Sequence, residues 1–133
     1  MIRIITDLLV WVILIILWGY NDGRRNERGL GIWPADNHGM AFMLRYIAAF
    51  LITLLVLYGW NDPPGLVHWI AVMANKGAIA WIVFDFSYVF ARKLPADYLG
   101  TTSWLDRIFQ SWTIQFIVKL IYLIGSIIFR MLV

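Results

Sequence analysis

Ionisable side chains inside long apolar runs are the residues of this sequence that could do chemistry. Lys76 and Lys119 each stand well inside such a run. A charge near the middle of a bilayer costs roughly 2.5–3.5 kcal/mol on insertion scales, so it normally faces protein or water and has a partner. Two hypotheses follow. The lysines belong to a path for ions or protons, or they fix the packing of helices.

Carboxylates are the candidate partners of these lysines. If residues 66–90 form a helix, Lys76 and Asp85 lie on opposite faces and cannot pair within it. Asp85 can reach Arg92 two turns further on, which predicts an ion pair near the membrane surface. Lys76 must find its partner elsewhere, either in Asp7 of the first apolar run or in another copy of the chain.

A polar stripe follows the last apolar run. Its members are Arg107, Ser111, Gln115, Lys119, Tyr122, Ser126 and Arg130. Steps of three or four residues keep them on one face of a helix. The stripe has three explanations. It lines a pore in an oligomer, it packs against the other helices or a partner, or its helix lies along the membrane surface.

The composition is that of a membrane protein. Of the 133 residues, 62% are hydrophobic and 14% are charged, whereas soluble domains average about half and about a quarter. The first run ends on bulky residues where a signal peptide has a cleavage site, so we expect an uncleaved anchor. Since a helix needs about 20 residues to cross a bilayer, the fold class predicted is all-α. We expect one integral membrane domain over 1–133, with short loops and spans at 4–20, 44–60, 66–90 and 107–130.

The distribution of basic residues predicts an orientation. Most of them fall in or beside the loops after the first and third spans: Arg24, Arg25, Arg28, Arg45, Arg92, Lys93 and Arg107. The opposite side has only Arg3 and Arg130. By the positive-inside rule, we expect the two basic loops to be cytoplasmic or matrix-side and both termini to lie on the non-cytoplasmic side.

The sequence offers little for catalysis. It has no cysteine, and we find no phosphate-binding loop, paired-carboxylate motif or zinc-protease motif. His38 and His68 fall on opposite sides of the predicted membrane, so we expect no metal, no cofactor and no enzymatic activity. Asn75-Lys76-Gly77 is a plausible helix break of the kind that transporters use at binding sites, although no symmetric partner accompanies it.

Four short segments carry a resemblance: 81–85 (WIVFD), 91–95 (ARKLP), 98–103 (YLGTTS) and 105–107 (LDR). This order resembles that in small multi-spanning membrane proteins encoded by phages and prophages of Bacteroidetes-type bacteria. His38 and Arg45, just before the second span, are also similar to that group. The resemblance implies a phage or bacterial inner-membrane setting. It supplies no activity and no catalytic residues.

The chain has interior polar residues and helix faces of small residues, such as Ala74 and Ala78, that suit close helix packing. These observations predict a structural or assembly subunit of a larger membrane complex. The expected partners are the lipid bilayer and other membrane subunits or further copies of the chain, with no nucleic acid. The expected location is the bacterial inner membrane or a phage-associated membrane. The alternative is an oligomeric pore former, holin-like or a small channel, lined by the C-terminal helix.

Overall fold

The computed structural model describes residues 2–28, 38–58, 65–95, 108 and 111–133. Its elements are α1 (Ile2–Glu27), α2 (His38–Thr53), the π-helix η1 (Leu54–Tyr58), α3 (Leu66–Ala91) and α5 (Trp112–Leu132). The described part of the chain is helical and contains no strand, which confirms the all-α prediction. Among the described residues, α1, α3 and α5 are long and apolar enough to cross a membrane, whereas the apolar part of α2, Met43–Val56, is shorter.

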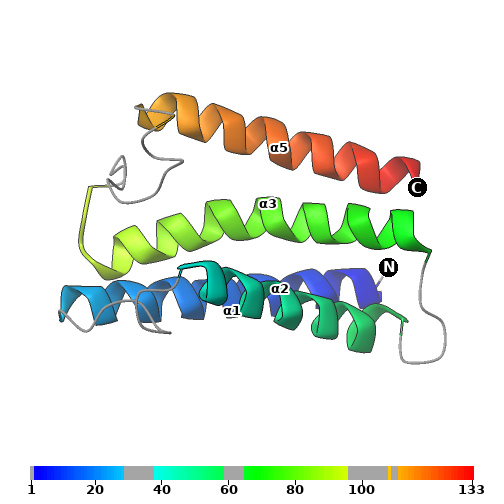
Figure 1. Cartoon of the computed structure of the whole chain (residues 1–133), viewed down its shortest axis with the longest axis horizontal. Helices are drawn as coiled ribbons and strands as arrows, with labels where there is room; N and C mark the ends of the chain where they lie inside the picture. The colour runs from blue at the N-terminus through cyan, green and yellow to red at the C-terminus, as the bar shows by residue number, and fades with distance from the viewer. Residues whose placement is uncertain (1, 29–37, 59–64, 96–107, 109–110) are drawn as a thin grey trace.

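Helix α3 is the central element of the bundle. Figure 1 shows α1 and α2 on one side of α3 and α5 on the other. Helices α1 and α3 run in the same direction, α2 and α5 run in the opposite one, and the two termini lie at the same end (Figure 1). Within the described residues, the backbone of α5 approaches α3 alone. The backbone packing of α5 against the described part of the bundle therefore depends on α3.

The first helix is longer than predicted. The sequence predicts a loop from residue 21, but α1 continues to Glu27, so this prediction is wrong for residues 21–27. The reason is that Gly23 serves close packing and does not break the helix. A Cβ built on Gly23 would lie 2.7 Å from the Tyr88 carbonyl oxygen and 2.7 Å from the Ala91 Cβ. One turn earlier, a Cβ on Gly19 would lie 2.7 Å from the Phe84 carbonyl oxygen.

Two further boundaries differ from the prediction. Helix α2 begins at His38, before the expected span start at residue 44, so Arg45 lies within a helix. Helix α3 is continuous from Leu66 to Ala91, so the proposed helix break at Asn75-Lys76-Gly77 is wrong. The expected start of the last span at residue 107 and the Arg107 position lie outside the described residues.

The core is small and the outer surface is apolar. Trp11, Ile15 and Ala49 form the centre of a hydrophobic cluster between α1, α2 and α3. Many large apolar side chains face outward, such as Ile13, which is 55% exposed, and Ile124, which is 56% exposed. Exposing such a surface to water costs free energy, whereas lipid acyl chains solvate it. The helices thus have the length, hydropathy and outer surface of a membrane protein.

Candidate functional site

The most buried polar contact joins α1 to α3. Lys76 donates from Nζ to Asp7 Oδ1 at 2.6 Å, and neither side chain has exposed surface. The Lys76 Nζ also lies 3.5 Å from the Ala49 carbonyl oxygen of α2. The structure therefore brings together the predicted residues Lys76 and Asp7 within one chain, and no second copy is needed for the pair to form.

The indole of Trp11 packs against this pair. Trp11 donates from Nε1 to the Lys76 carbonyl oxygen at 3.0 Å, and the Lys76 ammonium lies 5.5 Å from the centre of the Trp11 ring. Among the described residues, the second carboxylate oxygen of Asp7, Oδ2, has no hydrogen-bond partner. The ammonium is thus surrounded by a carboxylate, a carbonyl and an aromatic face, which together replace water.

A second ion pair joins α3 to α5. Lys119 donates from Nζ to Asp85 Oδ2 and to Gln115 Oε1 at 3.2 Å. Lys119 was expected to be an intramembrane cation with a partner, but Asp85 was predicted to form its ion pair with Arg92. The structure corrects this, because Asp85 meets Lys119 and Arg92 donates from Nη1 to the Tyr88 hydroxyl at 3.3 Å. The helical wheel missed the pair because it cannot show which neighbouring helix packs against each face.

The polar stripe of α5 faces α3. Gln115, Lys119 and Ser126 are the buried residues of this helix. Asn75 donates from Nδ2 to Ser126 Oγ at 3.2 Å, and Arg130 donates from Nη1 to Asn75 Oδ1 at 3.2 Å. Of the three explanations for the stripe, its described part matches packing against the other helices.

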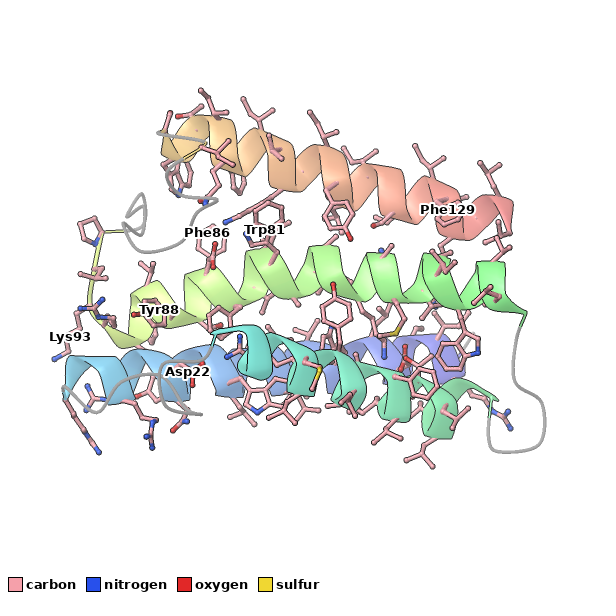
Figure 2. All side chains as sticks on the ribbon, in the orientation of Figure 1. Asp22, Trp81, Phe86, Tyr88, Lys93 and Phe129 are labelled. Atoms are coloured by element: carbon pink, nitrogen blue, oxygen red, sulfur yellow. The ribbon has the colours of Figure 1, made fainter. Side chains whose placement is uncertain are left out.

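Aromatic rings fill the space between these polar contacts. Trp81 packs edge-on against Tyr122, with ring centres 6.5 Å apart, and Phe86 packs edge-on against Phe116 at 6.4 Å. Figure 2 shows Trp81 and Phe86 on the side of α3 that faces α5. The contact between α3 and α5 therefore alternates rings with hydrogen bonds.

A third ion pair joins α1 to α2, and sequence reasoning missed it. Arg45 donates from Nη2 to Asp22 Oδ2 at 2.5 Å, and its guanidinium carbon lies 4.3 Å from the centre of the Phe84 ring. Asp22 was expected in the first loop, and Arg45 was counted among the basic residues in or beside that loop. The available signal was the spacing of Gly19 and Gly23, a GxxxG pair that marks a closely packed helix and so argues for extending the helix past residue 20.

Two hollows lie over α3 between α2 and α5, and the larger one also has Trp11 and Ile15 of α1 in its wall. The larger is about 400 Å³ and has Ala80, Trp81 and Phe84 of α3 in its wall. The smaller is about 360 Å³ and lies over Ile70 and Ala74. Both hollows are also lined by Tyr46 of α2 and Tyr122 of α5. Both tyrosine hydroxyls approach Gly77, where a Cβ would collide with that of Tyr46.

The arrangement is suited to packing more than to transport. The carboxylates of Asp7, Asp22 and Asp85 each bind a cation on another helix. A fully buried pair such as Asp7–Lys76 gains little net stability against hydrophobic residues, but breaking it is costly, so it favours the pairing of α1 with α3. Because the Asp7–Lys76 pair has no exposed surface, it offers no contact to a water-filled ion path in this conformation.

Comparisons with known proteins add no further assignment. No protein family, curated protein or solved structure matches the chain.

Proposed function

We propose that this protein is a structural or assembly subunit of a larger membrane complex, in which a transmembrane helix of another subunit occupies the groove between α2 and α5. The supporting observation is a contrast between two kinds of surface. The carboxylates of Asp7, Asp22 and Asp85 are paired within the chain, while a mostly apolar groove lined by rings and small residues is left open.

The length of the groove supports a helix as its occupant. The two hollows follow α3 from Trp69 to Asp85, which is about 24 Å at 1.5 Å per residue. The hydrocarbon core of a bilayer is about 30 Å thick, so the groove extends over most of it. Small residues form part of its floor, namely Ala74, Gly77 and Ala80. Small residues let helix backbones approach closely in membranes.

The two hollows suggest the chemistry of the partner helix. Their α3 linings centre roughly ten residues apart, which is about three turns. A partner helix with several bulky apolar side chains at each end of a three-turn interval can enter both hollows while passing over Tyr46 and Tyr122. Because Arg45 and Asp85 already bind Asp22 and Lys119, the groove calls for an uncharged helix.

The pore alternative needs a different arrangement of α5. A pore lined by this helix requires Gln115, Lys119 and Ser126 to face a lumen, whereas they are buried and bonded to α3 or to one another. This favours the subunit over the pore. A phage or bacterial inner-membrane setting is also part of the proposal, and it rests on the resemblance of the segments within residues 81–107.

Photo-cross-linking in native membranes tests the proposal. A photoreactive residue at Ile70, which lines the groove and is 53% exposed, should give one adduct of fixed mass with another membrane protein. The same residue at Ile124, which is 56% exposed, is the matched control and should give none. An adduct made of two copies of this chain, or no protein adduct at Ile70, would contradict the proposal. A conductance of the purified protein whose ion selectivity changes in Lys119→Glu would favour the pore.

A further inference from the structure

A separate hollow lies at the basic end of the bundle, where α1 and α3 both finish. Its volume is about 350 Å³, and its lining residues are Tyr20, Arg24, Phe90, Ala91, Lys93 and Leu94. It shares no lining residue with the groove between α2 and α5. From this hollow we infer that the protein binds the headgroup of an anionic phospholipid, with the phosphate between Arg24 and Lys93.

Close helix packing sets the two cations across one hollow. Gly23 of α1 rests against Tyr88 and Ala91 of α3, so the helix ends touch at this level. Arg24 is the residue after Gly23 in α1, and Lys93 lies two residues beyond the last residue of α3. Figure 2 shows Lys93 at this end of the bundle. Two cations facing one hollow give a phosphate the charge-assisted contacts that it binds best.

The backbone at Lys93 points to a use for its side chain. Its φ is 55°, and it is the one described non-glycine residue with a positive φ. The turn is held by hydrogen bonds from Lys93 N–H to the Phe90 oxygen at 3.1 Å and from Leu94 N–H to the Val89 oxygen at 3.0 Å. Glycine is the usual residue at this position after a helix. A lysine kept there despite the backbone cost suggests that its charge is needed.

The apolar part of the lining identifies a lipid as the source of the phosphate. Phe90 is 77% exposed and Tyr20 is 46% exposed, and both line the hollow. The apolar spans reach Arg25 on α1 and Ala91 on α3, so the hollow straddles the boundary between acyl chains and headgroups. Aromatic side chains favour that depth. The nearby carboxylate of Asp22 is bound by Arg45.

Net charge at this end favours an anionic lipid over a zwitterionic one. Three further cations lie at the same helix ends, namely Arg25, Arg28 and Arg92, against one acidic residue at the end of α1, Glu27, so the net charge of this end is positive. Basic pockets between membrane helices on the positive side of a protein are suited to anionic headgroups. A zwitterionic headgroup brings its own cation into this field and binds less well.

Native mass spectrometry of the full chain tests the inference. The protein is purified in micelles that contain equal amounts of phosphatidylglycerol and phosphatidylcholine, and the lipids that stay bound are counted. We expect preferential retention of phosphatidylglycerol. The variant Arg24→Gln/Lys93→Gly should lower that retention by roughly tenfold. Glycine suits the backbone at this position, so the helix end is kept.

A matched variant separates the hollow from general surface charge. Arg25→Gln/Arg28→Gln removes the same charge from the same end but touches neither lining cation, and its retention should fall less than twofold. An equal loss in both variants would overturn the inference, as would equal retention of the two lipids. Displacement of phosphatidylglycerol by millimolar inorganic phosphate would overturn the lipid as the source of the anion. The result is independent of the partner helix in the groove.

Discussion

At the scale of single residues, the two lysine pairs are unequal. The Asp7 and Lys76 side chains are both fully buried, whereas the Asp85 side chain is 44% exposed. A charge left without its partner costs most where nothing else can solvate it. Replacing the lysine by methionine should therefore lower the free energy of unfolding by different amounts in the two pairs.

Lys76→Met should destabilise the folded protein by about 3–5 kcal/mol, because it leaves the Asp7 carboxylate buried and unpaired. Lys119→Met should cost less, about 1–2 kcal/mol, since Asp85 keeps exposed surface. Equilibrium unfolding in mixed detergent micelles, followed by circular dichroism, measures both. The double variant Asp7→Ala/Lys76→Met should recover most of the loss. Equal losses in the two single variants would contradict this ranking.

Residue types alone predicted part of this site. Lys76 and Lys119 were identified because a charge in an apolar run needs a partner, and Gln115 because it belongs to the polar stripe of the last apolar run. Asp7 was one of two named partners for Lys76. The pairing of Asp85 was wrong, because a helical wheel gives the direction of a side chain but not the helix that lies there. The Asp22–Arg45 pair was missed since Asp22 was expected in a loop, where nothing fixes its distance from Arg45.

At the scale of elements, close packing extends α1 through a stretch of weak helix propensity. The residues 21–23, Asn-Asp-Gly, are typical of a turn, yet the contact of Gly23 with α3 and the ion pair of Asp22 keep them helical. Local sequence predicted the helix class of every described span, whereas the end of α1 depends on tertiary contacts that no local pattern contains.

Gly19→Ala should destabilise the pairing of α1 with α3 by about 1–3 kcal/mol, because overpacking forces the backbones apart. The built Cβ lies 2.7 Å from the Phe84 carbonyl oxygen and 2.8 Å from the Ser87 Cβ. Gly125→Ala is the matched control, since a Cβ there meets nothing within 4 Å, and it should be neutral or slightly stabilising. The measurement is the midpoint of thermal unfolding in detergent. A loss at Gly125 as large as at Gly19 would argue against the packing account.

The contact between α3 and α5 should show energetic coupling. In a double-mutant cycle, Asn75→Ala and Ser126→Ala should couple by about 0.6–1.7 kcal/mol, the range of hydrogen bonds between membrane helices. Unfolding in mixed micelles gives the four stabilities of the cycle. Asn75→Ala with Ile124→Ala is the control cycle and should show no coupling, because Ile124 lies on the exposed face. Coupling of the same size in both cycles would contradict a direct bond.

At the scale of the whole molecule, the described ion pairs lie between helices of the bundle, and the groove between α2 and α5 is left open. In Figure 1, α1 and α3 finish at one end of the bundle and both termini lie at the other, so the basic residues at the ends of α1 and α3 gather at one end. The groove could not be predicted, because it lies where α2 and α5 both pack on α3 without backbone contact with each other in the described residues, and no local sequence pattern contains that arrangement.

Filling the groove should remove the partner without unfolding the protein. Ala74→Leu places a larger side chain in the floor of the smaller hollow, so it should abolish the cross-link from Ile70 while stability changes by less than about 1.5 kcal/mol. Cross-linking in native membranes and unfolding of the purified variant measure the two effects. An unchanged adduct in Ala74→Leu would show that the partner binds elsewhere.

The central claim is that the polar face of α5 packs inside the protein, and cysteine accessibility tests it most directly. The chain has no cysteine, so Gln115→Cys and Ser126→Cys each provide one thiol without background. In native membranes, neither thiol should react with a membrane-impermeant maleimide until the protein is denatured in SDS. Rapid labelling of both thiols in intact membranes would contradict the account, because it would place the stripe along a water-filled lumen.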